Sequence, residues 1–320
     1  MSETGISEFR SGFVSLIGRP NAGKSTLLNA LAGQKLAIVS EKPQTTRTTI
    51  EGVVNLPQAQ IVFLDTPGIH QSTTLFNKRM METVRTALQD RDVLLYVADA
   101  SLPFSDEDLR AVSVFKDISA PVLFIANKID RIQDKRKLLP LIEQYKTARD
   151  FDDYLPVSAT TGEGLDKLRD AIVVRLPEGE AMFPTDHLTD QPERFLAAEL
   201  IREQILRHTR QEVPHSVAVI VERWEEKPRI VKIAATIYVE RDGQKAIVIG
   251  AAGAGLKKIG TLARHEIEKM LGHKVFLELF VKVRKDWRDD PQFLNAIDWR
   301  SMRGGELESD EGSVPSPGIK

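Results

Sequence analysis

The chain has 320 residues, enough for two domains, and its 42% hydrophobic and 28% charged residues are ordinary for a globular protein in water. It contains no cysteine, which excludes a disulfide framework, cysteine-based zinc sites and thiol chemistry. The N-terminal segment holds no apolar run and no apolar stretch of about 18 residues follows, so we expect neither a signal peptide nor a membrane-spanning helix.

The net charge of −2 is distributed unevenly along the chain. Residues 191–303 carry 21 Lys and Arg against 16 Asp and Glu, a net charge of +5, whereas residues 304–320 carry one Lys against four acidic side chains. A basic second half suggests a polyanionic partner. A chance imbalance on a solvated surface would explain the charge alone equally well.

The first motif lies between an apolar, β-prone segment at 13–17 and a helical segment at 26–31. It has the form G-x-x-x-x-G-K-S and consists of Gly18, Arg19, Pro20, Asn21, Ala22, Gly23, Lys24 and Ser25. A strand, a glycine-rich turn and a helix are the context of a phosphate-binding loop, because backbone N–H groups and the helix N-terminus then face the phosphates. Lys24 can reach the β- and γ-phosphates, and the Ser25 hydroxyl can bind Mg²⁺. The alternative is a glycine-rich turn before an ordinary helix.

Residues 11–178 alternate apolar strands with amphipathic helices. Strands are predicted at 13–17, 50–54, 61–64, 93–98, 122–126 and 154–157, and helices near 24–32, 76–89, 106–117, 135–149 and 164–175. This alternation predicts an α/β fold with a mostly parallel sheet and helices on both faces. Ligands of such sheets bind at the carboxyl ends of the strands, and each motif below follows a strand.

Residues 34–49 are polar and rich in threonine. A hydroxyl from this segment can bind Mg²⁺ when a nucleoside triphosphate is present, and such segments commonly act as order–disorder switches. We favour Thr46 over Thr45 as the ligand. A threonine-rich loop or edge strand is the alternative.

The strand at 61–64 is followed by Asp65, Thr66, Pro67, Gly68 and Ile69, all of which we include in the predicted nucleotide site. Asp65 can hold Mg²⁺ directly or through water. The backbone N–H of Gly68 can approach a γ-phosphate and so sense its presence. Taken alone, the stretch is also a good turn sequence.

The strand at 122–126 is followed by Asn127, Lys128, Ile129 and Asp130, and the strand at 154–157 by Ser158, Ala159 and Thr160. Asp130 can accept hydrogen bonds from guanine N1–H and N2–H₂, which adenine lacks. Asn127 can bond the base edge, and the stem of Lys128 can cover the base. The segment 158–160 can offer a backbone N–H to guanine O6. Four motifs in this order, each after a strand, predict a guanine-nucleotide site.

The chain after the first domain begins with a proline- and glycine-containing stretch at 175–190 and continues as a second unit. We predict a helix at 193–208, strands at 216–224, 231–240 and 275–283, a tight turn at Asp242–Gly243 into 244–249, a helix ending near 271 and a short helix at 289–297. The predicted divisions are a flexible N-terminus (1–10), a first domain (11–178), a linker (179–190), a second domain (191–302) and an acidic disordered tail (303–320).

One motif of the second unit is the G-x-x-G stretch formed by Gly250, Ala251, Ala252 and Gly253. It is a poor phosphate loop, because Leu256 stands where a lysine is needed. Within an α-β-β-α-α-β order, a G-x-x-G turn between helices is the loop with which KH domains clamp nucleic acid. The loop and the lysines that follow, Lys257 and Lys258, are therefore candidate RNA contacts. A plain glycine-rich helix junction is the alternative.

With both halves considered, the chain resembles the Era family of bacterial GTPases over roughly residues 10–300. The resemblance rests on residues 18–25, 43–47, 65–68, 127–130, 158–160 and 239–245, and on the G-x-x-G stretch. It implies a P-loop GTPase domain followed by an α+β, KH-like domain of type II. It also implies binding of GTP, GDP and Mg²⁺ and hydrolysis of GTP to GDP and phosphate.

The resemblance further implies partners and a location. The expected partners are 16S rRNA near its 3′ end and the 30S subunit, whose assembly and rRNA maturation the protein would assist, and no DNA partner is expected. The expected location is the cytoplasm, with partial association with the inner face of the cell membrane.

Two departures from related patterns bear on these expectations. Family members often have a basic or polar residue inside the G-x-x-G loop, where this chain has alanines, so phosphate contacts would come from backbone N–H groups, Lys245, Lys257 or Lys258. Ras-type GTPases have a water-orienting Gln just after D-x-x-G, whereas Ile69 stands here, so slow intrinsic turnover is expected.

Some relatives with an asparagine at the position of Asn21 recruit K⁺ beside the phosphates. Asn21, with backbone carbonyls at 36–40, is therefore a candidate K⁺ site, and its alternative role is that of a turn residue. The candidate catalytic residues are Asn21, Lys24, Thr46 and Gly68.

Two other functions fit a GTPase of this design. A GTPase of tRNA modification is one, but its best-known family carries a C-terminal cysteine that this chain lacks. A membrane or cytoskeletal switch that uses the second domain for protein contacts is the other. The charge of the second domain and its G-x-x-G stretch favour RNA.

Overall fold

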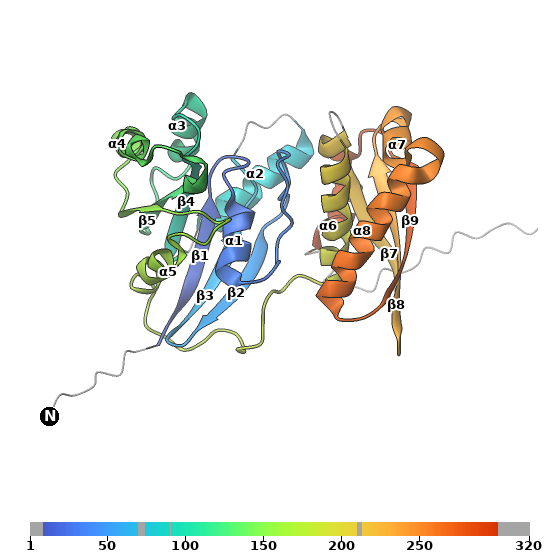
Figure 1. Ribbon diagram of the computed structural model, residues 1–320, viewed down its shortest axis with the longest axis horizontal. Helices are drawn as coiled ribbons and strands as arrows, with labels where there is room; N and C mark the ends of the chain where they lie inside the picture. Colours follow the sequence, from blue (N-terminus) through green and yellow to red (C-terminus); the bar gives the residue numbers. More distant parts are fainter. Residues whose placement is uncertain (1–8, 70–73, 90, 210–212, 300–320) are drawn as a thin grey trace, which may run out of the picture.

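The computed structural model describes residues 9–69, 74–89, 91–209 and 213–299, which form two layered units, each built on one sheet (Figure 1). The strands of the first sheet are β1 (Arg10–Ile17), β2 (Ile50–Leu56), β3 (Ala59–Asp65), β4 (Val93–Asp99), β5 (Val122–Asn127) and β6 (Asp153–Pro156). Their order is β2-β3-β1-β4-β5-β6, and every neighbouring pair is parallel except β2 with β3. The prediction of a mostly parallel sheet is confirmed.

Helices cover both faces of this sheet. The helices are α1 (Lys24–Ala32), α2 (Leu75–Ala87), α3 (Asp106–Ser113), α4 (Leu138–Ala148) and α5 (Leu165–Val173). Apolar side chains of α1 and α5 pack on one face, and those of α2, α3 and α4 on the other. The central strands are buried along most of their length for this reason. The carboxyl ends of β1, β3, β4 and β5 meet at one edge.

The second unit has a three-stranded sheet with the order β7-β8-β9. Its elements are α6 (Glu193–His208), β7 (Ala218–Lys227), β8 (Ile230–Val239), α7 (Asp242–Ile249), α8 (Ala254–Leu271), β9 (Val275–Val283) and α9 (Pro291–Ala296). β7 and β8 are antiparallel, β8 and β9 are parallel, and α6 and α8 bury their apolar side chains against the sheet. The α-β-β-α-α-β order expected of a KH-like domain is confirmed.

The tight turn predicted at Asp242–Gly243 is wrong. These residues form the first turn of α7, because the side chain of Gln244 accepts the backbone N–H groups of Glu240 (2.9 Å) and Arg241 (3.1 Å) and so caps the helix. The predicted acidic tail (303–320) and residues 1–8 of the predicted N-terminus lie outside the described residues.

The stretch around 182–191 runs along β2, the edge strand of the first sheet. The backbone N–H of Val53 donates to the carbonyl of Leu188 at 2.9 Å, and the amide of Asn55 donates to the carbonyl of Thr185 at 3.0 Å. The side chain of Gln60 accepts from the backbone N–H of Phe183 at 2.9 Å. The chain between the two units is therefore attached to the first one.

The two units also share an apolar cluster. It joins Phe76 and Met80 of α2 to Trp287, Phe293 and Leu294 of the second unit. Among the described residues no single helix could span a membrane, and only the bent pair Asp242–Ile249 and Ala251–Leu271, with an angle of 43° between them, passes by length and composition.

Candidate functional site

The glycine-rich loop joins β1 to α1 at the carboxyl edge of the first sheet. Gly18 has a φ of +146°, and a Cβ there would lie 2.2 Å from the carbonyl oxygen of Val97, so only glycine fits. The ammonium of Lys24 is buried and donates to the carbonyls of Gly18 (3.1 Å) and Arg19 (3.0 Å). Burial lowers the pKa of Lys24 to about 8, against the opposing effect of Asp65. The loop therefore holds a buried cation, which suits an anionic ligand.

The three predicted Mg²⁺ ligands come together at the start of α1. The hydroxyl of Ser25 lies 2.5 Å from Asp65 Oδ2 and 2.7 Å from the hydroxyl of Thr46, which lies 3.2 Å from the same carboxylate oxygen. The second oxygen of Asp65, Oδ1, is buried and has no hydrogen-bond partner among the described residues. Two hydroxyls and a carboxylate are hard oxygen donors, so these residues fit Mg²⁺.

The electrostatics of Asp65 agree with this fit. Burial raises its pKa to about 6, and Lys24, Ser25 and Thr46 only partly counteract the burial. A divalent cation would remove most of this penalty.

The segment after Asp65 packs directly against the glycine-rich loop. A Cβ at Gly68 would lie 2.6 Å from the backbone of Pro20, and the N–H of Ile69 donates to the carbonyl of Gly18 at 3.1 Å. The side chain of Thr66 is turned toward β1, where it donates to the carbonyl of Leu16 at 2.7 Å. The side chain of Thr66 therefore holds β1 and does not line the cleft.

The amide of Asn127 holds three loops together. Its Nδ2 donates to the carbonyl of Ala22 at 2.9 Å, and its Oδ1 accepts the N–H of Ala159 at 3.1 Å. Lys128 donates to the carbonyl of Asn21 and to Asp99 Oδ2, both at 2.6 Å. An amide nitrogen carries two hydrogens, so one hydrogen of Asn127 is left for a base edge.

Asp130 is exposed and follows β5, the strand that ends beside the glycine-rich loop. Its Oδ1 accepts the hydroxyl of Ser158 at 2.6 Å, and that hydroxyl in turn accepts the N–H of Thr161 at 3.1 Å. The carboxylate is therefore oriented by the 158–161 loop, while one oxygen stays open to a ligand. Ala159 is buried, and Thr160 is exposed beside it.

Many of these groups line one cleft of about 760 Å³, whereas Gly18, Asp65, Asp130 and Ser158 are not among its lining residues. Its walls include the glycine-rich loop, residues 38–46, Gly68, Asn127, Lys128 and the segment 159–160. Asn21, with a φ of +61°, donates from its side chain to the carbonyl of Glu41 and so joins two of these walls. The cleft has the size and polarity for a nucleotide.

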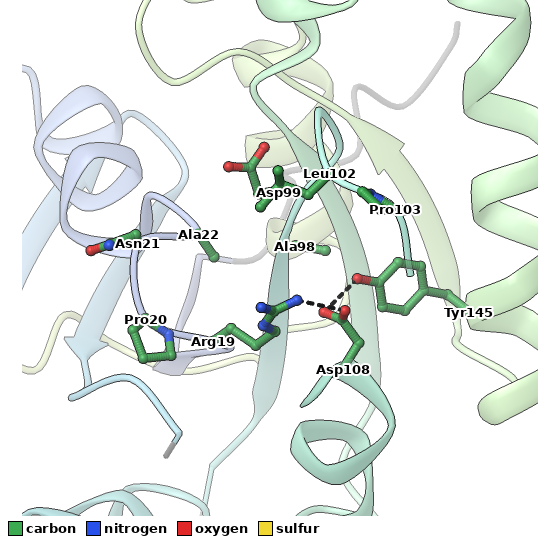
Figure 2. Close-up of a pocket in the computed structure, with 10 residues that line it drawn as sticks. All are labelled: Arg19, Pro20, Asn21, Ala22, Ala98, Asp99, Leu102, Pro103, Asp108 and Tyr145. Atoms are coloured by element: carbon green, nitrogen blue, oxygen red, sulfur yellow. Dashed lines mark hydrogen bonds and ion pairs between the residues drawn. The ribbon is translucent and has the colours of Figure 1, made fainter. Parts of the chain in front are cut away.

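Arg19 belongs to the loop, but its side chain points away from this cleft. It donates to Asp108 at 2.7 Å and to Ser105 at 3.0 Å, and it contacts Glu107. Figure 2 shows Asp108 between Arg19 and the hydroxyl of Tyr145, which donates to the carboxylate at 2.7 Å. Arg19 therefore anchors the loop to α3, and its carbonyl accepts from Lys24.

The switch segment, residues 34–49, lies against α6 of the second unit (Figure 1). Lys35 donates to Glu203 at 2.6 Å and to Glu266 at 2.8 Å, and the N–H of Val39 donates to Glu203 at 3.0 Å. Arg202 donates to the carbonyl of Thr45, the neighbour of the candidate Mg²⁺ ligand Thr46.

Arg47, two residues after Thr45, reaches into the second unit. It donates to the carbonyls of Val217 (2.5 Å) and Pro214 (3.2 Å), and its guanidinium lies 5.2 Å from the ring centre of Phe76 and 5.8 Å from that of Trp287. One face of the nucleotide cleft is thus built directly on the second domain.

A separate cleft of about 420 Å³ lies beside the G-x-x-G loop, of which only Gly253 is a lining residue. It is lined by Gly253, Leu256, Lys257, Gly260, Thr261 and Arg264 of α8 and its start, and by Leu277 and Leu279 of β9. Ala251 and Ala252 are exposed, and Ala252 has a φ of +48°. Gly250 cannot carry a Cβ, which would lie 2.8 Å from Gly255 N. Lys258 is exposed but is not among the lining residues.

Sequence reasoning missed several residues that position these sites. Asp99, which holds Lys128, ends an apolar strand at the ligand edge of the sheet, a place that would have identified it. Arg47 lies in the 43–47 stretch that carries the resemblance, but its contacts with the second unit were not predicted. Arg202, Glu203 and Arg264 had no comparable signal, because their importance comes from contacts between segments far apart in the sequence.

Comparisons with known proteins agree with both domains. The model of the 50S ribosome-binding GTPase family matches residues 13–128, and that of the KH domain matches residues 212–288. GTPase Era of Geobacter metallireducens is 50% identical over 291 residues, which cover 90% of this chain and 97% of the relative. GTPase Era of Syntrophus aciditrophicus is 49% identical over 288 residues, which cover 89% of this chain and 94% of the relative.

Solved structures of Era are also similar to this chain. A variant of Aquifex aeolicus Era bound to GDP and AlF₄⁻ superposes with a TM-score of 0.87 at 40% identity, over 91% of this chain and 99% of that one. Era bound to MgGDPNP and nucleotides 1506–1542 of 16S ribosomal RNA superposes with the same TM-score, identity and coverage. The chain therefore belongs to the Era family and is a GTPase.

Proposed function

We propose that this GTPase is a nucleotide-controlled switch that binds 16S rRNA near its 3′ end and assists 30S subunit assembly and rRNA maturation. The observation that carries the proposal is the exposed G-x-x-G cleft, with Lys257 and Arg264 on its wall, in the same chain as the nucleotide cleft. The solved Era complex with nucleotides 1506–1542 of 16S rRNA supports the same assignment by similarity.

The proposed nucleotide contacts follow from the geometry of the first cleft. Backbone N–H groups of residues 18–25 and the Lys24 ammonium bind the phosphates, and Ser25, Thr46 and Asp65 hold Mg²⁺. When bound, Mg²⁺ would neutralise negative charge on the β- and γ-phosphates. Asp130 reads guanine, with Asn127, Lys128 and the 158–160 segment around the base.

The proposed reaction relies on positioning and charge stabilisation, because Ile69 offers no group to orient water. Ile69 packs in the apolar core below the site instead. Lys24 withdraws charge from the β–γ bridge, and the backbone of Gly68, fixed against Pro20, approaches the γ-phosphate. Turnover is expected to be slow without a partner.

We also propose K⁺ as an additional electrostatic aid. Asn21 already joins the phosphate loop to the carbonyl of Glu41, so a cation near that carbonyl would lie beside the phosphates. Hydrolysis should be faster in K⁺ than in Na⁺ at equal ionic strength, and Asn21→Ala should remove the difference. Equal rates of the unmodified protein in both salts would contradict this assignment.

We place the domain limits at 11–178 and 191–302 with a linker at 179–190, and the protein in the cytoplasm with partial association with the inner membrane face. The membrane association rests on the family resemblance. Vesicle flotation of the full chain, with each nucleotide, tests it: recovery of the protein only in the lipid-free fraction contradicts it.

Co-sedimentation with purified ribosomal subunits tests the main proposal. The full chain loaded with GDPNP should pellet with 30S and not with 50S subunits, and a 16S fragment with the 3′ end should compete in a salt-dependent way. Competition by tRNA instead would favour a role in tRNA modification. Binding to neither RNA would favour a second domain that contacts proteins.

A further inference from the structure

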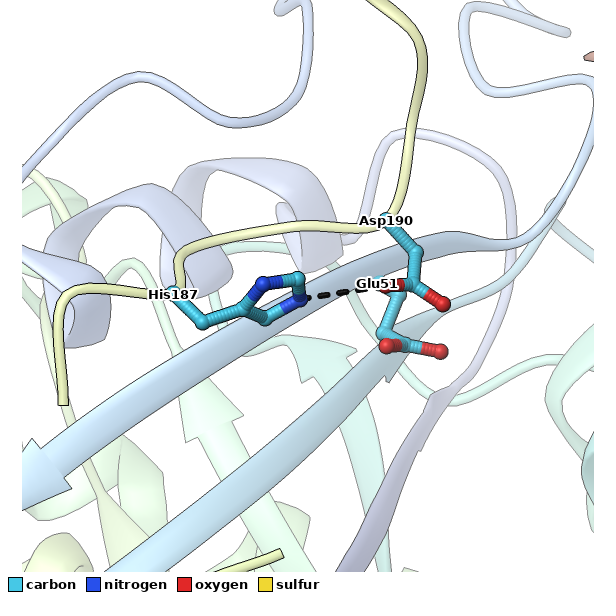
Figure 3. A group of neighbouring side chains, drawn as sticks. All are labelled: Glu51, His187 and Asp190. Carbon is cyan, nitrogen blue, oxygen red and sulfur yellow. Dashed lines mark ion pairs between the residues drawn. The ribbon is translucent and has the colours of Figure 1, made fainter. Parts of the chain in front are cut away.

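A His and two carboxylates come together where the stretch before α6 crosses β2. Glu51 stands on β2, and His187 and Asp190 come from the crossing segment (Figure 3). One ligand atom from each of the three side chains lies within 4.8 Å of the other two. His187 Nε2 lies 3.1 Å from Asp190 Oδ1. None of these residues belongs to the nucleotide cleft or to the G-x-x-G cleft.

The cluster is held in place by contacts outside it. The N–H of Val53 donates a hydrogen bond of 2.9 Å to the carbonyl of Leu188 in the crossing segment. The hydroxyl of Thr189 donates to the carbonyl of Glu51 at 2.6 Å. The ring of His187 stacks on Phe183 with 4.7 Å between centroids and 9° between planes. The backbone around the cluster and the ring of His187 are therefore held in place before any ligand arrives.

Partial burial makes the charge of this cluster consequential. The side chains of His187 and Asp190 are only 27% and 26% exposed, and one carboxylate oxygen of Glu51 and the Nε2 of His187 are shielded from solvent. Two carboxylates at this separation repel each other unless a positive charge lies between them. A divalent cation between them would balance both carboxylates.

We propose that Glu51, His187 and Asp190 bind a divalent transition-metal ion, for which Zn²⁺ is the best-fitting species. Zn²⁺ accepts imidazole nitrogen and carboxylate oxygen at about 2.0–2.2 Å, so ligand atoms in a tetrahedral site lie about 3.4 Å apart, compared with the 4.8 Å within which the three atoms lie here. Mg²⁺ prefers oxygen donors alone and fits less well. The fourth position goes to water.

The bound ion would join the crossing segment to the strand that follows the switch segment. Glu51 lies on β2, five residues after the candidate Mg²⁺ ligand Thr46. The ion would therefore attach the stretch that leads to the second domain to β2. This role is structural and independent of the proposed RNA partner.

Calorimetric titration of the full-length, metal-stripped and nucleotide-free protein with Zn²⁺, in excess MgCl₂, tests the site. One Zn²⁺ should bind per chain, and His187→Gln should weaken binding at least tenfold. Glu51→Gln, a second variant of a different side chain, should do the same. His273→Gln makes the identical change at an exposed loop position and should bind Zn²⁺ like the unmodified protein.

Two further measurements separate this site from the phosphate loop. Co²⁺ bound in place of Zn²⁺ should give visible absorption bands that are lost in His187→Gln and kept in Ser25→Ala. Zn²⁺ should raise the melting temperature of the unmodified protein and of His273→Gln, but not that of His187→Gln. Zn²⁺ affinity unchanged by both His187→Gln and Glu51→Gln, or no Zn²⁺ binding at all, would overturn the proposal.

Discussion

Asp130 combines exposure with a fixed orientation, and this combination suits a residue that reads a base. Ser158 occupies one face of its Oδ1, and the exposed remainder of the carboxylate can accept from a guanine edge. A carboxylate without a donor in that position would be left unpaired, which is how adenine is rejected.

Replacing Asp130 by Asn should change base selection. The amide presents one acceptor and one donor, so GTP binding should weaken by about 2–4 kcal/mol, the scale of charge-assisted hydrogen bonds and an unpaired group. Xanthosine triphosphate, whose C2 oxo group accepts from the new amide, should bind better than GTP. Nucleotide titration monitored by fluorescence checks both, with the exposed Asp117→Asn as control. Equal affinity of the unmodified protein for ATP and GTP would contradict the assignment.

Asp65 illustrates a functional residue that destabilises its own fold. Its folded-state pKa of about 6 exceeds the ordinary value of 3.8, so the ionised carboxylate destabilises the protein above pH 6, and this effect disappears as the pH falls toward 3.8.

Asp65→Asn should therefore stabilise the nucleotide-free protein by about 1–2 kcal/mol at pH 8 and by much less at pH 5, because the lost Ser25 and Thr46 hydrogen bonds offset part of the gain. Urea unfolding at both pH values measures it. The same variant should lose Mg²⁺-dependent GTP binding. The prediction would be contradicted if the stability gain of Asp65→Asn over the unmodified protein were smaller at pH 8 than at pH 5. Such a result would show that the buried charge is already compensated.

At the scale of elements, the sequence predicted the strands and helices well because their periodic apolar patterns are strong. The failure at Asp242–Gly243 came from a local motif that is typical of hairpins but also permits a helix start when a Gln follows at the third helical position. The site was predictable as a set of loops at strand ends. The contacts of individual side chains were not predictable. Thr66 and Arg19 belong to the motifs, yet their side chains bond to β1 and α3.

The G-x-x-G loop can be tested with a matched pair of glycines on α8. Gly253 precedes the helix with a φ of +80°, and Gly272 follows it with a φ of +67°; a Cβ at either position meets no atom within 4 Å. Gly253→Asp should weaken RNA binding at least tenfold, about 1.4 kcal/mol, because the carboxylate would lie where phosphate approaches. GTP binding should not change.

Gly272→Asp carries the same backbone strain and charge at the far end of α8, so it should keep RNA affinity. Filter binding of the full chain to a 16S 3′-end fragment, repeated at several salt concentrations, compares the two variants. Lys257→Ala should also lower the slope against log salt by about one unit. Unchanged RNA affinity of a folded Gly253→Asp would refute the clamp.

At the scale of the whole molecule, the residue after the candidate Mg²⁺ ligand Thr46 is inserted into the second domain. Arg47 donates to two carbonyls there and lies against Phe76 of α2 and Trp287. Thr46 already lies beside Ser25 and Asp65 while Arg47 makes these contacts. A nucleotide state that moves Thr46 away from the candidate Mg²⁺ site would move or strain the Arg47 contact, so nucleotide state and RNA affinity should be coupled. The coupling is reciprocal by thermodynamic necessity.

Arg47→Lys should reduce that coupling, since lysine keeps the charge but cannot bond two carbonyls in a planar fork. The ratio of RNA affinities with GDPNP and GDP should move toward one, while the affinity for GDP alone stays within about threefold. Parallel RNA titrations with each nucleotide give the ratio, and Arg110→Lys on the exposed surface of α3 is the control. An unchanged ratio would place the coupling elsewhere in the interface.

The pairing of the 182–191 stretch with β2 has a mechanical consequence. Residues whose backbone is hydrogen-bonded to a sheet edge cannot extend as a free linker. The full length of the segment between the domains therefore overstates how far apart the domains can move. The reach of the second domain is set by the few unpaired residues on either side of that contact. A single cut in the polypeptide there would leave both halves attached through the sheet edge and the shared apolar cluster, rather than releasing two free domains.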